Sequence, residues 1–248
     1  MPRPTRGKAP PSWKIVEDPT DRFSSGVPGL DRLLGGGYAR GSFAMFDFDA
    51  SVLPSDYVTL LAPTLLNFLY QSRGILAVLP SREAPHRFRE TFLSWVSRRL
   101  FDSRVRIVDY AGEDDESPYV VSLAHQEKNE AMQRMVSAER AVQGAHKRPF
   151  IELNAIEVLE TVVGAEQAAK MYFFGMKRTR DVGNLGVALL RPGLKVADAA
   201  RSLMDYEFTV RRTDLGLLLT GLRPSFSAHL VVEDRQRGPP AIELIPSP

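Results

Sequence analysis

Short apolar runs alternate with amphipathic segments along most of the chain, which is the pattern that repeated strand and helix units produce. The run Gly74–Leu79 (GILAVL) is continuous and apolar, as is typical of a strand buried on both faces of a parallel sheet. Apolar side chains recur at helical spacing in the segment that follows it. The pattern predicts strands at Ser42–Phe48, Gly74–Leu79, Arg104–Tyr110, Phe150–Ile156 and Leu185–Leu190. It predicts helices at Tyr57–Gln71, Pro85–Phe101, Ser122–Lys147, Ala165–Arg180 and Ala197–Met204.

The C-terminal part of the chain has a different pattern, in which polar and apolar residues alternate with a period of two. Turn residues separate the alternating segments, which favours an antiparallel meander. Its expected strands are Glu207–Arg211, Gly216–Thr220, His229–Glu233 and Ala241–Ile245. The complete pattern predicts an α/β fold, with a mostly parallel sheet flanked by helices and a C-terminal antiparallel extension.

The N-terminal segment lacks this periodicity. Met1–Pro19 carries five prolines and several basic residues, which indicates a flexible arm over residues 1–19 and a single domain over 20–248. A basic arm that binds nucleic acid is the alternative interpretation. The acidic run Glu113–Glu116 is expected to be a solvated loop.

Composition excludes several classes of function. The 32 Lys and Arg residues nearly balance 30 Asp and Glu residues, so no overall field attracts nucleic acid. The absence of cysteine excludes a disulfide framework and thiolate chemistry, and the four histidines are too scattered to predict a metal site. No apolar run approaches the roughly 18 residues of a membrane span. We therefore expect a cytoplasmic protein with no membrane partner and no metal.

A short helix with an abrupt end is expected just before the first strand. Leu30, Leu33 and Leu34 share one apolar face, and Gly35–Gly37 follow them. Glycine accepts the positive φ values that other residues resist, so this triplet ends the helix.

The surrounding segment, RFSSGVPGLDRLLGGGYARGS, resembles the entrance to the ATPase core of the RecA superfamily, in particular its KaiC and RadA branch. The residues that match the pattern of that branch are Ser25, Gly26, Gly29, Leu30, Asp31, Leu33, Leu34, Gly35, Gly36, Gly37 and Gly41. A lone glycine triplet is weak evidence, but many matches in one spacing are specific. The resemblance implies a RecA-like fold over most of the chain beyond the arm.

The resemblance also implies a phosphate-binding loop, G-x-x-x-x-G-K-[ST], directly after the first strand. In register, the chain offers DFDASVLP instead, and no lysine occurs between Lys14 and Lys128. Carboxylates oppose polyphosphate, and proline removes an N–H donor from a loop that must present donors. We therefore expect no ATP or Mg²⁺ cofactor. The altered loop positions are Asp47, Asp49, Ala50, Val52, Leu53 and Pro54.

Two further positions of the implied mechanism are changed. Where KaiC-like members carry paired glutamates, this chain has Arg82 followed by Glu83. Where the metal-binding aspartate is implied, it has Asn154, whose amide binds hard divalent cations less well than a carboxylate does. Glu83 has a simpler interpretation as a helix N-terminal acid, and Glu152 is expected to face away from Asn154.

Arginines form the candidate contact surface. They are dense between Arg82 and Arg106, and Arg191 follows the fifth strand, where RecA relatives place a loop that contacts DNA or senses nucleotide. A solvated helix face and a tight turn are the simpler interpretations of these two features. The apolar segment Met171–Met176 is expected to be buried. The candidate nucleic-acid or partner contacts are Arg87, Arg98, Arg99 and Arg191.

These features favour a pseudo-ATPase, a KaiC-like or RadA-like protein that has lost ATP hydrolysis. Such a protein would act as a regulatory or scaffolding subunit, in a homo-oligomer or in a hetero-oligomer with a RecA-like, KaiC-like or other protein. A DNA-binding accessory of recombination or repair, similar to the RadA paralogues, is the alternative. An ATP-binding protein with an atypical loop is the third hypothesis.

Overall fold

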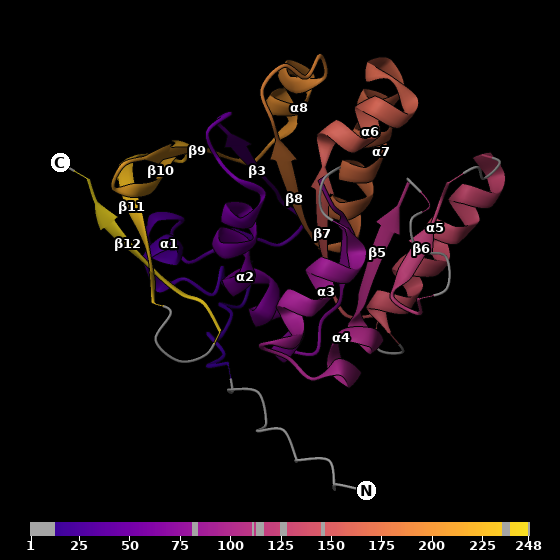
Figure 1. Ribbon diagram of the computed structural model, residues 1–248, viewed down its shortest axis with the longest axis horizontal. Coiled ribbons are helices and arrows are strands. Elements are labelled where there is room, and N and C mark those ends of the chain that lie inside the picture. The colour runs from indigo at the N-terminus through magenta and orange to yellow at the C-terminus, as the bar shows by residue number, and fades with distance from the viewer. Residues whose placement is uncertain are drawn as a thin grey trace, which may run out of the picture.

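The computed structural model describes residues 13–80, 84–110, 112, 117–124, 128–144, 147–234 and 239–247. Within them the chain forms one large sheet, with the strand order β12-β11-β10-β9-β3-β8-β7-β4-β5-β6. A short antiparallel pair, β1 (Arg22–Phe23) and β2 (Tyr38–Ala39), brackets helix α1 (Pro28–Leu33). Figure 1 shows the C-terminal strands at one end of the large sheet and α5 with β6 at the other.

The parallel part of the sheet confirms the expected RecA-like α/β class. Neighbouring strands from β9 to β6 all pair in parallel. Every residue of β8 is buried, as a continuous apolar strand between two helical layers requires. The parallel strands are β3 (Phe43–Phe48), β4 (Ile75–Val78), β5 (Val105–Asp109), β6 (Val120–Ser122), β7 (Ile151–Ala155), β8 (Leu185–Leu190) and β9 (Tyr206–Thr213).

The expected antiparallel extension is also confirmed. It consists of β10 (Gly216–Arg223), β11 (Ser225–Asp234) and β12 (Ala241–Pro246), which pair in succession. Strand β9 joins the two parts, since it runs parallel to β3 and antiparallel to β10. The sheet is therefore continuous from the parallel core to the C-terminal meander.

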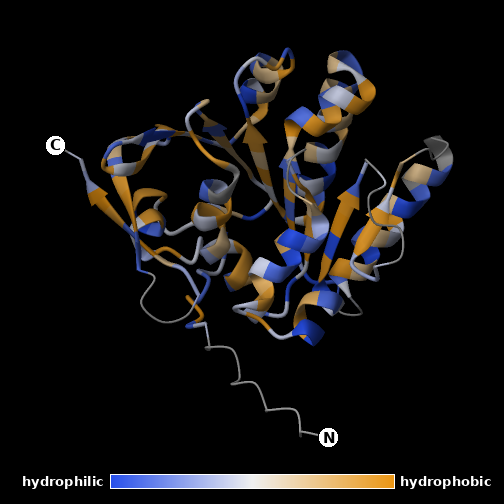
Figure 2. Cartoon of the chain, viewed as in Figure 1, coloured by the Kyte–Doolittle hydropathy of each residue, from blue (hydrophilic) through white to orange (hydrophobic). Residues whose placement is uncertain are grey.

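Helices cover both faces of the sheet. On one face, Phe46, Phe48 and Leu153 belong to the core that α1, α2 (Pro54–Tyr70), α3 (Pro85–Leu93) and α4 (Arg98–Arg104) complete. On the other face, Phe43 and Met45 pack with the layer of α5 (Lys128–Gln143), α6 (Ile156–Val163), α7 (Ala165–Val182) and α8 (Ala197–Leu203). Because strand residues alternate between faces, one strand supplies both cores. Figure 2 shows the apolar strands between helices of mixed hydropathy.

Three local predictions are wrong. The helix expected at Pro85–Phe101 is two helices, because Ser97 accepts the Leu100 N–H at 3.2 Å and begins a new helix at Arg98. The helix expected from Ser122 begins at Lys128, and β6 precedes it. Helix α6 follows β7 without a break and was not predicted, because its apolar residues continue the strand's pattern.

Part of the expected N-terminal arm is packed on the domain. Residues 1–12 and the acidic run 113–116 lie outside the described residues. Asn67 of α2 accepts the Val16 N–H at 2.9 Å and donates to the Val16 carbonyl at 3.0 Å. Asp18 forms an ion pair with Arg73 at 2.5 Å. The contacts of the domain therefore begin before residue 20.

Candidate functional site

The segment that carries the family resemblance is organised by one carboxylate. Asp31 accepts the Ser24 hydroxyl at 2.5 Å and the Ser25 N–H at 2.7 Å. The Ser25 carbonyl then accepts the buried Thr64 hydroxyl of α2 at 2.7 Å. Asp31 therefore joins the entrance segment to the first long helix of the core.

The three glycines after α1 adopt the backbone that was predicted for them. Gly35, Gly36 and Gly37 have φ values of +69°, +112° and +104°. Gly37 also lies so close to the Phe23 carbonyl that a Cβ atom would overlap its oxygen. Only glycine fits there without displacing the β1–β2 pair.

The loop after β3, where the resemblance places phosphate binding, is a tight turn that uses its own donors. The Ser51 N–H donates to the Asp49 carboxylate at 2.9 Å, and the Val52 N–H donates to the Asp49 carbonyl at 3.1 Å. The bonds to Ser51 hold the pKa of the exposed Asp49 below its ordinary value. Val52 is buried, Ala50 is exposed and Leu53 is half exposed.

The N-terminus of α2 is closed by a carboxylate of the helix itself. Asp56 accepts the Leu53 N–H at 2.9 Å, and its own N–H donates to the Leu53 carbonyl at 3.0 Å. Arg212 of strand β9 forms an ion pair with Asp56 at 2.5 Å. Helix α2 begins at Pro54, which has no N–H to offer. The positive end of the helix dipole is therefore occupied by Asp56.

Asp47 and Asp49 were both predicted as altered positions of the phosphate-binding loop, and the structure gives them different partners. Asp47 is the fifth residue of β3 and shares a face with Phe43 and Met45. Arg201 of α8 holds its carboxylate at 2.6 Å. Asp49 lies beyond the end of β3, in the turn, where its carboxylate accepts the Ser51 N–H.

Asn154 lies on the sheet face that α5 to α8 cover, whereas its neighbour Leu153 belongs to the core beneath α2. Glu152 lines the same cavity as Asn154, which contradicts the expectation that it faces away. Strand residues two apart point to the same face, and this rule would have identified the pair from the sequence. Arg82 and Glu83 lie outside the described residues.

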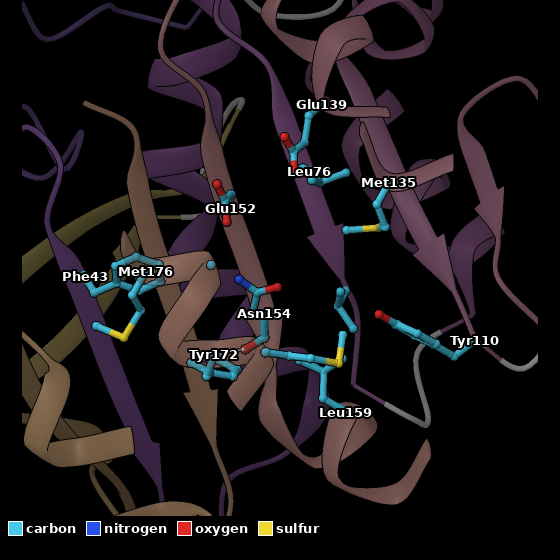
Figure 3. Close-up of a pocket in the computed structure, with 13 residues that line it drawn as sticks. Phe43, Leu76, Tyr110, Met135, Glu139, Glu152, Asn154, Leu159, Tyr172 and Met176 are labelled. Atoms are coloured by element: carbon cyan, nitrogen blue, oxygen red, sulfur yellow. Dashed lines mark hydrogen bonds between the residues drawn. The ribbon is translucent and has the colours of Figure 1, made fainter. Parts of the chain in front are cut away.

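The cavity that contains Glu152 and Asn154 has a volume of about 120 Å³ and lies between the sheet, α5 and α7. Figure 3 shows both side chains on one side of β7, with Glu139 and Met135 reaching toward them from α5. Burial raises the pKa of Glu152 to about 7, against a hydrogen bond from Thr179 at 2.8 Å. This carboxyl therefore changes charge near neutral pH.

The candidate arginines divide into two groups. Arg87, Arg98 and Arg99 are exposed and form no ion pair with any other described residue. Arg89, by contrast, makes a bidentate pair with Asp102 at 2.9 and 3.0 Å. Arg191 is half buried and donates to the Val52 carbonyl at 3.3 Å, which ties β8 to the turn after β3. Of the candidate arginines, Arg87, Arg98 and Arg99 are therefore the ones available to contact a partner.

The apolar segment of α7 is only partly buried, so its predicted burial is wrong for three of its five side chains. Tyr172 and Met176 are covered, whereas Met171, Phe173 and Phe174 are 39%, 55% and 68% exposed. The segment is helical, and only one side of a helix meets the sheet.

Two kinds of site are absent from the part of the chain that the structure describes. No group of three or more His, Cys, Asp or Glu side chains is placed to hold a metal ion there. No helix within those same residues has the length and apolar character to cross a bilayer.

The order of the parallel strands, the glycine-bounded entrance and the helical layers define a RecA-like domain of the KaiC type. A KaiC-like protein of Pyrococcus horikoshii has a similar fold, with a TM-score of 0.60 over 91% of this chain and 100% of that one. The two sequences are 10% identical, so this likeness concerns the fold alone.

The chain belongs to the family described as GvpD basic region 2, whose profile matches residues 12–178. Two proteins of Halobacterium salinarum are its relatives. Protein GvpD2 is 30% identical over 102 residues, which are 41% of this chain and 21% of that protein. Protein GvpD1 is 31% identical over 105 residues, which are 42% of this chain and 20% of that protein. The chain thus spans about a fifth of the length of the curated relatives that it matches.

Proposed function

We propose that this chain is a KaiC-like domain without ATP hydrolysis, which acts as a regulatory or scaffolding subunit through contacts with other macromolecules. The turn after β3 carries this proposal. Phosphate binds at a helix N-terminus through free N–H groups and the helix dipole. Here the N–H groups of Ser51, Val52, Leu53 and Asp56 all have acceptors within the turn, and Asp56 occupies the helix end.

Binding ATP would require several of these bonds to break and would bring polyphosphate close to two carboxylates, Asp49 and Asp56. Of the arginines near the turn, Arg212 is paired with Asp56, and Arg191 donates to the Val52 carbonyl. Two like unit charges about 4 Å apart repel each other by roughly 1 to 4 kcal/mol, depending on how far solvent screens them. Both the donors and the charges of the turn therefore oppose a phosphate chain.

Calorimetric titration with Mg-ATP tests the absence of nucleotide binding. We expect no heat of specific binding at protein concentrations of about 50 μM, which would exclude the micromolar affinity that an ATP site requires. Circular dichroism on the same sample verifies that the protein is folded. Micromolar affinity that is lost in Asp49→Ala would instead establish the hypothesis of an ATP-binding protein with an atypical loop.

The exposed aromatic residues of α7 support assembly of the chain with a second copy of itself. Phe173 and Phe174 contact each other, with ring centroids 6.0 Å apart, and both are more than half exposed. Such residues are frequent at the centres of protein interfaces. Phe174→Glu should lower the mass measured by light scattering to that of one chain, and Val182→Glu, near the C-terminal end of α7, is the control. A wild-type protein that is monomeric at about 100 μM would refute assembly through this face.

Nucleic-acid binding is the second candidate function, and the unpaired arginines favour it. Arg87, Arg98 and Arg99 lie within the residues that match the family profile, and the family's description names a basic region. Exposed guanidinium groups release counterions when they meet phosphate, so affinity falls steeply with salt. The plot of log K against log salt has a negative slope. The double variant Arg98→Ala/Arg99→Ala should make this slope less steep by about 2.

Arg134→Ala is the matched control for the arginine variant. Arg134 is also an exposed helical arginine, but it pairs with Glu130 at 3.0 Å. Fluorescence anisotropy with a labelled DNA duplex at several salt concentrations measures both variants. Binding that is independent of salt, or equal loss in the control, would exclude the candidate surface.

A further inference from the structure

The cavity between α5 and α7 combines apolar walls with a charged floor. Leu76 from β4 and Met135 from α5 line it together with Met171 and Tyr172 from α7. Its volume of about 120 Å³ is several times the roughly 30 Å³ that one water occupies in the liquid. Met171 at its edge is 39% exposed, so the cavity can be reached from solvent. Its size suits a short alkyl or aromatic group.

Two carboxylates from different elements meet at this cavity. Glu152 of β7 accepts the buried Thr179 hydroxyl at 2.8 Å, and Glu139 of α5 forms an ion pair with Arg178 of α7. Burial raises the pKa of both carboxyl groups. The charge of Glu139 raises the pKa of Glu152 further, and the charge of Arg178 lowers it. When Glu152 is ionised, two carboxylates of the described residues therefore face one guanidinium, and one negative charge has no counter-charge.

Among the described residues, the other ionisable groups that face Glu152 do not supply a positive charge. Tyr172 of α7 lies beside it, and burial keeps the pKa of that phenol well above its ordinary value. Tyr110, which follows β5, also lines the cavity, and burial raises its pKa to about 12. Both phenols are neutral near pH 7, so they add aromatic surface and no charge.

The walls suit an organic cation better than a metal ion or an anion. Thioether and aromatic surfaces pack on alkyl stems and attract ammonium groups. A metal would need further oxygen or nitrogen ligands, and the described residues contain no such cluster. An anion would meet Glu152 and Glu139. We propose that this cavity binds a primary ammonium or guanidinium group on a short alkyl stem, with the cationic head on Glu152 and Glu139 and the stem against the methionines.

The cation has two conceivable sources, a free small amine or a lysine or arginine side chain of a partner. In both cases the bound group supplies the positive charge that the cavity lacks. Binding requires the ionised form of Glu152, so affinity should rise as pH increases through about 7. This direction is the reverse of what a titrating amine produces, since an amine loses its charge only at higher pH.

Titration of the full chain, labelled with ¹³C at its methionine methyl groups, with n-butylammonium tests the proposal by NMR. The methyl signals of Met135, Met171 and Met176 should shift with saturation, and n-butanol, which has the same stem and no charge, should shift them at least tenfold more weakly. A pentalysine peptide is the second probe. Saturation by butylammonium indicates a free amine, and saturation by the peptide alone indicates a partner side chain.

Glu152→Gln should weaken binding at least tenfold and remove its pH dependence, while the amide keeps an acceptor for Thr179. Glu166→Gln is the matched control, because Glu166 lies on α7 but is 86% exposed and pairs with Lys170. If Glu152→Gln is unfolded, Glu139→Gln should produce the same loss. Equal binding of n-butanol, undiminished binding by the glutamine variants, or no shift with either cationic probe would overturn the proposal.

Discussion

The segments on either side of β3 differ in which parts of the molecule their hydrogen bonds connect. In the entrance segment, Asp31 and the glycines make contacts that only those residues can make, and these contacts join β1, α1 and α2. In the turn after β3, Asp49 and Asp56 satisfy the donors that a phosphate group would otherwise satisfy. The hydrogen bonds of the entrance segment therefore connect separate elements of the fold, whereas those of Asp49 and Asp56 stay within the turn and the start of α2.

The largest loss of folding stability should come from a substitution in the entrance segment. Gly37→Ala places a methyl group against the Phe23 carbonyl at a φ of +104°, which should lower the free energy of unfolding by about 3 kcal/mol. Gly35→Ala is the control, because its φ is +69° but no atom lies within 4 Å. It should cost about 1 kcal/mol. Urea denaturation measures both, and equal costs would show that overlap is unimportant at Gly37.

Asp31→Asn should have the next largest effect. The amide loses the charge and one of the two acceptors that hold Ser24 and Ser25, which should cost about 2 kcal/mol. Asp198→Asn removes the same charge from a side chain that is 99% exposed, and it should leave the melting temperature within the error of calorimetry. If Asp31→Asn changes the melting temperature as little as Asp198→Asn does, the turn at Ser24 and Ser25 does not depend on the carboxylate.

A smaller effect is expected in the turn after β3. Asp56→Ala removes the acceptor at the N-terminus of α2 and the partner of Arg212, which should cost about 1 kcal/mol. Chemical denaturation measures the change. A cost as large as that of Gly37→Ala would contradict the contrast between the two segments, since the turn would then be equally important for the fold.

The smallest effect should come from Asp47. Its pair with Arg201 is partly exposed, and such pairs contribute about 0.5 kcal/mol. Asp47→Asn should therefore change stability little, and the difference from wild type should shrink further in 1 M NaCl, where exposed charges are screened. A cost above about 2 kcal/mol would show that the pair is needed to position α8.

Much of the fold could be predicted from the sequence because its signals are local. A continuous apolar run such as Leu185–Leu190 indicates a buried strand wherever it occurs, and a glycine triplet ends a helix through its own backbone. Helix α6 was missed because its apolar residues follow β7 directly, so that no turn residue marks the change. The break between α3 and α4 depends on a single serine cap.

The candidate site was less predictable. The family resemblance predicted that Asp49, Leu53 and Pro54 replace the residues of a phosphate-binding loop. It did not show that Asp56 closes the helix end, because a carboxylate in the first turn of a helix is common and its partner Arg212 lies 156 residues away. The cavity around Glu152 was missed for the same reason, since its walls come from six separate helices and strands and from Tyr110.

By itself, the sequence determined the α/β class and the entrance motif and predicted the loss of the phosphate-binding residues, because each depends on neighbours within a few positions. Only the tertiary structure decided that Asp47 turns toward α8 while Asp56 closes α2, and that Glu139 and Glu152 meet at one cavity. The direction of a side chain follows from the strand that carries it, but its partner depends on how distant elements pack.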